Sequence, residues 1–318
     1  MKVRFAKMHG VGNDFVMIDD RDGTFPVEKG TLAAIGARGT GVGCEGIILV
    51  QKSETADFRM RFFNPDGSEA EMCGNGARCV AAFARAIGAV ATDAMRFETI
   101  AGEVRAEIVG PSLVRIELPA PKDLRTDFVN SGVPHKIVPV EDLEAADVAG
   151  EGRRIRYSAE FAPAGTNVDF VRYAPPHDAF IRTYERGVEA ETGACGTGSV
   201  AAAVVGVAQY GLSFPVAVHT AKGFELTIDG AFDGERFSSV TLTGPVAHVF
   251  DGELEPHCLV PAGYQKVASA LEEGRCRVAI PNHEIAQVFV SDIKAKINNA
   301  LAHEARRQVE LCSEPCRH

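Results

Sequence analysis

One short motif occurs twice in this sequence, and the duplication constrains the fold more than any other feature. The stretches CGNGA, starting at Cys73, and CGTGS, starting at Cys195, each lead into a segment rich in Ala and Val. Gly88 and Gly211 follow these segments at positions suited to end a helix. A helix that is small-sided and apolar all round belongs inside a fold. We therefore expect an α/β (α+β) protein with two pseudo-symmetric domains, each a curled mixed or antiparallel sheet wrapped around a central Ala-rich helix.

Segments with strand character also form two series. The first series runs from residues 2–5 to 114–118 and the second from 136–140 to 247–250, with Gly, Pro or Asp between the segments. Two prolines in the stretch LPAPKD, which starts at Leu118, separate the series. We predict an N-terminal half at 1–118, completed by a strand near 247–253, and a C-terminal half at 119–246. Residues 255–318 fit neither half, and apolar side chains at every fourth position from 293 to 309 predict an amphipathic helix in this extension.

The charge balance and the cysteine pattern exclude several classes of protein. The 33 basic and 43 acidic residues give a formal charge of −10, and no local basic cluster occurs, so we expect no nucleic-acid partner. No run of about 18 apolar residues occurs and the amino terminus lacks a signal-peptide pattern, so we expect a cytoplasmic protein without a membrane partner. The eight cysteines include no C-x-x-C pair, and we predict neither a disulfide scaffold nor a metal site.

The two cysteines at the predicted helix starts carry the chemistry. A thiol there meets free backbone N–H groups and the positive end of the helix dipole, which favours the thiolate and predicts a lowered pKa. A single Cys-Gly-x-Gly turn is more often only a tight connection, but two copies favour a functional site. Facing each other, Cys73 and Cys195 would flank the α-carbon of an amino acid, one as thiolate base and one as thiol acid. Backbone N–H groups would stabilise the charge that moves onto the carboxylate, so no cofactor is expected.

Three blocks of the sequence resemble the signature blocks of the diaminopimelate epimerase family. They are KMHGVGNDFVMID at 7–19, FFNPDGSEAEMCGNGARC at 62–79 and YERGVEAETGACGTGS at 184–199. The resemblance runs from residue 2 to about 252 and implies a cofactor-independent isomerase that interconverts LL- and meso-diaminopimelate for lysine and peptidoglycan synthesis.

The resemblance also implies roles for individual residues. It makes Cys73 and Cys195 the catalytic pair and gives His135 a supporting place beside them. The residues that it implies in substrate binding are Asn13, Asn64, Gly74, Asn75, Asn167, Glu185, Arg186, Gly196 and Thr197. Val133 and Gly46 depart from the family's pattern, which commonly has Asn and Gln there.

Two other functions remain open from the sequence. A proline-type racemase also uses paired cysteines, although its first block typically has His where this chain has Asn75. A non-catalytic carboxylate-binding or redox-sensing protein could use the same two thiols without turnover. The expected partner is a small-molecule substrate, and the sequence leaves a homodimer open.

Overall fold

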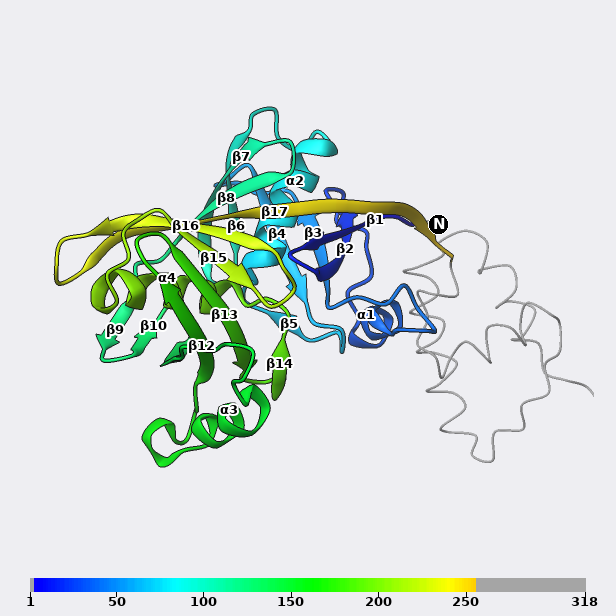
Figure 1. The fold of residues 1–318 in the computed structure, drawn as a ribbon. Helices are drawn as coiled ribbons and strands as arrows, with labels where there is room; N and C mark the ends of the chain where they lie inside the picture. Colours follow the sequence, from blue (N-terminus) through cyan, green and yellow to red (C-terminus); the bar gives the residue numbers. More distant parts are fainter. Residues whose placement is uncertain (1–2, 256–318) are drawn as a thin grey trace, which may run out of the picture.

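A computed structural model describes residues 3–255 of the chain, and the predicted helix near 293–309 lies outside these residues. Figure 1 shows two lobes that lie side by side and share the long strand β17 (Phe237–Leu254). The strands of the first lobe are β1 (Val3–Gly10), β2 (Asn13–Asp19), β3 (Gly46–Gln51), β4 (Phe58–Phe63), β5 (Glu69–Ala70), β6 (Ala94–Thr99), β7 (Gly102–Gly110) and β8 (Leu113–Leu118), and its helices are α1 (Lys29–Gly36) and α2 (Gly74–Ala86).

The second lobe has the same general plan. Its strands are β9 (Lys122–Arg125), β10 (Phe128–Asn130), β11 (Pro134–Pro139), β12 (Asn167–Ala174), β13 (Asp178–Glu185), β14 (Ala190–Thr192), β15 (Val216–Thr220) and β16 (Glu225–Phe232). Its helices are α3 (Val148–Arg156), the short 3-10 helix Ala159–Phe161 and α4 (Gly196–Gln209).

The sheet of the first lobe closes on itself around α2. Strand pairing runs from β17 through β1, β2, β3, β4, β6, β7 and β8 and returns to β17; the β2–β3 and β4–β6 pairs are parallel and the others antiparallel. Inside this ring, α2 buries Cys79, Val80 and Ala81 completely. Because most of the buried face is small, the strands approach the helix closely.

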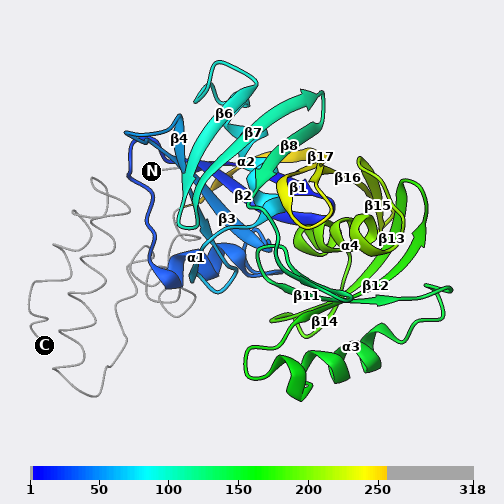
Figure 2. The same ribbon diagram turned by 90° about the vertical axis from the view of Figure 1, so that its left-hand side faces the viewer.

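The sheet of the second lobe curls around α4 without closing. Pairing runs from β17 through β16, β15, β13, β12, β11 and β10 to β9, with β14 on the edge of β13. Figure 2 shows α4 enclosed by these strands. All side chains from Val200 to Val205 are at most 1% exposed. The predicted fold class, two curled sheets that each surround an Ala-rich helix, is confirmed.

The ends of both central helices also agree with the sequence. α2 stops at Ala86 and α4 at Gln209, and Gly88 and Gly211 follow with φ angles of +67° and +72°, a region that favours glycine. The sequence did not indicate α1 and α3, which cover outer faces of the two sheets: Leu32 and Ile35 of α1 pack on β2 and β3, and Val148 of α3 packs on β12 and β13.

Strand β17 connects the lobes. Its residues 237–243 pair with β16, residues 240–245 with β8, and residues 246–254 with β1. Within residues 3–255, no helix is both long and apolar enough to span a membrane.

Candidate active site

The shared strand β17 brings the amino-terminal ends of α2 and α4 together. A Cβ atom added at Gly196, the first residue of α4, would lie 3.7 Å from Cδ1 of Leu242 in β17 and 3.8 Å from Oδ1 of Asn75 in α2. A Cβ atom added at Gly244, two residues further along β17, would lie 3.1 Å from Nε of Arg78 in α2. The two Cys-Gly-x-Gly turns therefore meet at the junction of the lobes.

Cys73 lies immediately before α2 and is half-buried. Its backbone is extended (φ −133°, ψ 123°), as is typical of the residue that caps a helix. Burial is the largest influence on the thiol and raises the pKa of Cys73. The backbone N–H groups of Gly76 and Asn75 and the guanidinium of Arg78 act in the opposite direction, and the carboxylate of Glu185 adds to the increase.

Cys195 lies immediately before α4 and is 9% exposed. Its Sγ accepts a hydrogen bond from the N–H of Gly198 at 3.4 Å. Burial raises the pKa of Cys195, and the carboxylates of Glu185 and Asp169 add to the increase. The predicted lowering of the pKa at both helix starts is therefore wrong for this structure: the N–H groups act as expected, but loss of water around a buried thiol has the larger effect.

A chain of polar side chains leads from Cys195 into the interior of the second lobe. Sγ of Cys195 lies 3.4 Å from Oγ1 of Thr197, which lies 3.0 Å from Nε2 of His135. Nδ1 of His135 lies 2.6 Å from Oδ2 of Asp169, and both side chains are fully buried. The carboxylate oxygen accepts, so Nδ1 carries hydrogen and donates to it. His135 thus lies one residue away from a predicted catalytic thiol, at the place implied by the resemblance.

The carboxylate of Glu185 affects the pKa of both thiols. Glu185 ends β13, and its Oε2 accepts a hydrogen bond from Oγ1 of Thr192 at 2.8 Å. Its carboxylate raises the pKa of Cys73 in the first lobe and of Cys195 in the second. Burial in turn raises the pKa of Glu185 itself. A single carboxylate can act on both thiols only if they border the same region of the molecule.

The chain turns directly after Glu185. Gly187 has a φ of +94°, and the backbone N–H of Arg186 donates to Oδ1 of Asn167 at 2.7 Å. Nη1 of Arg186 donates to the carbonyl oxygen of Ala164 at 3.4 Å, and among residues 3–255 no carboxylate pairs with this guanidinium. The turn that the neighbouring Glu185 and Arg186 require to serve one site is therefore present.

The two asparagines of the first lobe lie in different surroundings. Asn13 begins β2 opposite Gly10 of β1, and a Cβ atom at Gly10 would lie 3.0 Å from the carbonyl oxygen of Asn75. Oδ1 of Asn13 is buried and has no hydrogen-bond partner among residues 3–255, so it is available to accept from a ligand. Asn64 follows β4 in a turn, where its Nδ2 donates to Oγ of Ser68 at 3.1 Å. The hydrogen bonds of Asn64 in the described part of the chain go to Ser68 and Gly67, not to another site residue.

Two charged residues near the thiols escaped the sequence analysis. Arg78 is fully buried in α2, and Asp169 is fully buried in β12. Each has the same sequence signal, a charged residue flanked on both sides by apolar residues. The apolar pattern around them indicates only buried core, so it does not single out either charge.

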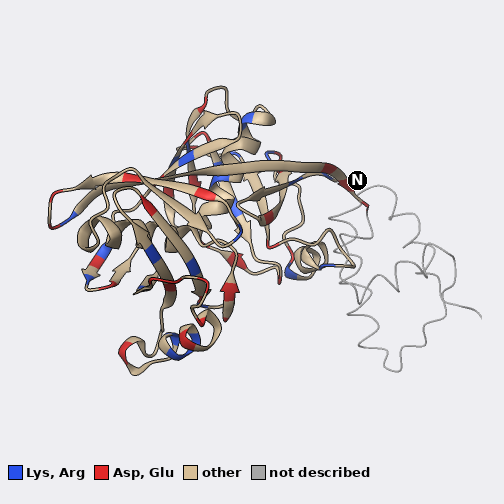
Figure 3. Ribbon diagram, in the orientation of Figure 1, with Lys and Arg blue, Asp and Glu red and all other residues tan. Residues whose placement is uncertain are grey.

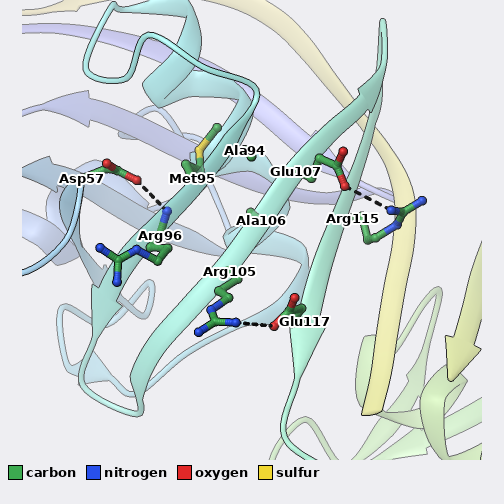
Figure 4. Close-up of a pocket in the computed structure, with 9 residues that line it drawn as sticks. All are labelled: Asp57, Ala94, Met95, Arg96, Arg105, Ala106, Glu107, Arg115 and Glu117. Carbon is green, nitrogen blue, oxygen red and sulfur yellow. Dashed lines mark hydrogen bonds and ion pairs between the residues drawn. The ribbon is translucent and has the colours of Figure 1, made fainter. Parts of the chain in front are cut away.

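A separate cavity of about 310 Å³ lies on the outer face of β6, β7 and β8, and neither Cys73 nor Cys195 lines it (Figure 4). Its charged side chains are paired: Arg115 lies 3.1 Å from Glu107 and Arg105 lies 3.7 Å from Glu117. Figure 3 shows Lys and Arg interspersed with Asp and Glu over both lobes. This cavity is a hydrated face of the sheet with compensated charge, and it presents no free group to a ligand.

Comparisons with known proteins agree with the geometry. The family model for diaminopimelate epimerase matches residues 5–117 and 128–249. A diaminopimelate epimerase from Aquifex aeolicus (strain VF5) is 44% identical over 81% of this chain and 99% of its own length. One from Chlorobaculum tepidum is 40% identical over 78% of this chain and 99% of its own length.

Solved structures with much lower identity share the fold. A phenazine biosynthesis protein of the PhzF family from Bacillus anthracis has a TM-score of 0.62 at 17% identity, over 80% of this chain and 99% of that one. A probable proline racemase from Agrobacterium radiobacter K84 has a TM-score of 0.59 at 15% identity, over 81% and 96%. The family match and the relatives that cover most of the chain lead to one conclusion: this chain belongs to the diaminopimelate epimerase family.

Proposed function

We propose that this protein is an isomerase that epimerises LL-diaminopimelate to meso-diaminopimelate without a cofactor, in the synthesis of lysine and peptidoglycan precursors. The family membership supports the reaction and the substrate. The single structural observation that carries the proposal is that the first turns of α2 and α4, which follow Cys73 and Cys195, meet: a Cβ atom at Gly196 would lie 3.8 Å from Oδ1 of Asn75.

The proposed reaction transfers protons on both faces of one carbon atom. The thiolate of one cysteine removes the proton from the α-carbon and becomes a thiol. The electron pair moves onto the adjoining carboxylate, where backbone N–H groups at the two helix starts stabilise it. The other cysteine donates its proton to the opposite face and becomes the thiolate. The inverted product leaves an enzyme whose cysteines have exchanged roles.

The substrate's second amino-acid head requires a cation for its carboxylate and acceptors for its ammonium group. We propose Arg186 for the carboxylate, because its guanidinium has no carboxylate partner among residues 3–255. We propose Glu185, Asn13 and Asn64 around the ammonium group. Asn167 holds the backbone of Arg186 and so positions it. Gly74, Asn75, Gly196 and Thr197 would surround the reacting carboxylate.

The organisation of the molecule remains part of the proposal. We propose that residues 1–118, with the strand near 247–253, and residues 119–246 act as two halves that close over the substrate. We also propose a cytoplasmic protein whose partner is a small molecule, not nucleic acid or membrane. For a homodimer, light scattering after size-exclusion chromatography gives the test: the mass should be twice 33.9 kDa.

Solvent exchange tests the function directly. In D₂O the reduced enzyme should incorporate deuterium at the α-carbon of LL-diaminopimelate and form the meso isomer. Cys73→Ala and Cys195→Ala should each lose epimerisation. Cys79→Ala, which alters another buried cysteine of α2, is the matched control and should keep it. A folded wild-type enzyme that exchanges no deuterium would contradict the proposal, and turnover of L-proline instead would identify a proline-type racemase.

A further inference from the structure

The two halves of the site differ in charge, because α2 carries Arg78 where α4 carries an apolar residue. When the two motifs are aligned on their cysteines, Arg78 in α2 corresponds to Val200 in α4. Arg78 is 0% exposed and Val200 is 1% exposed. A guanidinium therefore occupies a core position that an apolar side chain fills in the other copy.

Arg78 has no carboxylate partner among residues 3–255. Its Nη2 donates to Oδ1 of Asn75 at 2.8 Å and its Nη1 donates to the carbonyl oxygen of Gly74 at 3.3 Å. Nε has no hydrogen-bond partner, and the close approach of Gly244 in β17 leaves little room for one. A buried cation without a counter-ion costs several kcal/mol of stability. An anion beside it would reduce this cost, and the two titratable groups with the largest electrostatic effect on Arg78 are Cys79 and Cys73.

Of these two thiols, Cys73 is the one that can supply the anion. Cys79 is 0% exposed, and burial raises the pKa of Cys79 to about 12. Cys73 is half-buried, and the backbone N–H groups of Gly76 and Asn75 lower its pKa against the effect of burial. A carboxylate that opposes its thiolate is Glu185, at the end of β13.

The surroundings of Cys195 have the opposite sign. The charged groups with the largest effect on Cys195 are the carboxylates of Glu185 and Asp169, and both raise its pKa. The hydroxyl of Thr197 lies 3.4 Å from Sγ of Cys195 and 3.0 Å from Nε2 of His135, so it can accept from the S–H and donate to the ring nitrogen. A chain in which Cys195 donates to Thr197 and Thr197 donates to His135 favours the protonated form of Cys195.

We propose that Arg78 is a positioning residue that makes Cys73 the thiolate and Cys195 the thiol in the resting enzyme. It provides a fixed positive charge behind Cys73 and holds Asn75 by its amide oxygen. The inference rests on the proposed epimerase function, because only a two-base site gives the difference between the thiols a purpose.

Alkylation of the substrate-free wild-type enzyme gives the first test. Each thiol's rate of reaction with iodoacetamide is measured against pH, with Cys73 and Cys195 read separately by mass spectrometry of their peptides. The pH midpoint follows the thiolate fraction and is independent of steric access. The midpoint of Cys73 should lie below that of Cys195. The reverse order would overturn the inference and leave the epimerase function, which deuterium exchange decides, untouched.

Variants of Arg78 give the second test. Arg78→Met should raise the midpoint of Cys73, slow its alkylation about tenfold at pH 7.5 and leave the midpoint of Cys195 in place. Arg78→Lys keeps the charge and should restore the wild-type midpoint of Cys73. Arg85→Met, which removes an exposed charge paired with Asp93 from the same helix, is the matched control and should change neither midpoint.

The same variants separate a positioning role from a structural one. Because Met replaces an unpaired buried charge, Arg78→Met should melt no lower than the wild type. An unchanged Cys73 midpoint in this variant would overturn the inference. If Arg78→Met does not fold, the Arg78→Lys variant and the order of the wild-type midpoints still decide it.

Discussion

At the scale of single residues, one buried carboxylate connects the two thiols. Glu185 disfavours the thiolate of Cys73 and of Cys195, and its own ionised form is disfavoured by burial. It is nevertheless well placed to bind an ammonium group of the substrate. Its position is consistent with a group kept for binding at a cost in stability.

Replacing this carboxylate by an amide should change both thiols. In Glu185→Gln, the pH midpoints for alkylation of Cys73 and Cys195 should both fall, because a nearby negative charge has been removed. Peptide-level alkylation measures both at once. A shift at Cys195 alone would contradict a shared site.

The same variant should change the pH dependence of stability. Burial raises the folded-state pKa of Glu185 above the ordinary value of 4.5, so its contribution to stability is present below that pH and is lost as pH rises through the folded-state pKa. Glu185→Gln should therefore melt above the wild type at pH 7.5, with the difference disappearing below pH 4.5. Thermal unfolding by circular dichroism at the two pH values measures this, and a variant less stable at both would refute it.

Asp169 should matter more to stability than any other residue near the site. It accepts from Nδ1 of His135 at 2.6 Å and from Oγ1 of Thr183 at 2.7 Å, in a region without water contact. Asp169→Ala leaves both donors buried and unpaired, and we expect a loss of about 3–5 kcal/mol in the free energy of unfolding. Thr183→Val removes one of the two bonds and should cost about 1 kcal/mol. Urea unfolding provides both values; similar losses for the two variants would show that the His135 contact is unimportant.

At the scale of elements, the sequence predicted the two repeated central helices. It did not predict α1 and α3, whose formation depends on tertiary contacts. The central helices and their terminal glycines follow from local pattern alone. α1 has no side-chain cap and contains two glycines, and α3 contains two glycines that offset its cap at Asp147 and the arginines of its last turn. Both are helical because they cover an outer face of a sheet. The thiol pKa values and the charges at Arg78 and Asp169 were missed for a related reason, since burial depends on the complete fold.

Close packing around α4 can be tested at one glycine. A Cβ atom at Gly206 would lie 2.6 Å from Cδ1 of Leu212 and 2.8 Å from Cε1 of Tyr173. The Tyr173 ring is stacked on Tyr210 at 4.6 Å and donates to the carbonyl oxygen of Ala202, so it cannot move freely. Helix propensity alone favours Ala over Gly by about 1 kcal/mol, but overpacking costs about 1–3 kcal/mol.

We therefore expect Gly206→Ala to lower the free energy of unfolding by about 1 kcal/mol. In a Leu212→Ala background, which removes one of the two clashes, the same substitution should cost less. The comparison uses the midpoints of urea unfolding for the wild type, the two single variants Gly206→Ala and Leu212→Ala, and the double variant. Stabilisation by Gly206→Ala in the wild-type background would show that propensity outweighs packing at this position.

At the scale of the whole molecule, β17 makes the two lobes structurally dependent on each other. The strand belongs to both sheets, and Gly244 near its centre packs against Arg78 beside the active site. The lobes also touch where the ring of His9 lies 6.1 Å from that of Phe224. Unfolding of either lobe would expose one edge of β17 and remove half of the site.

The chain should consequently unfold in urea as one cooperative unit, and its own residues provide a probe for each lobe. The sequence has no Trp, and four of its five tyrosines lie between residues 157 and 210, so tyrosine fluorescence in a Tyr264→Phe background reports on the second lobe. Cys44 and Cys79 are 2% and 0% exposed in the first lobe, and pulse labelling of their thiols reports on that one. Because β17 cannot leave one sheet without disturbing the other, the two urea midpoints should coincide. Separate midpoints, with the first lobe still protecting its thiols after the tyrosine signal has changed, would show that the shared strand does not couple the lobes.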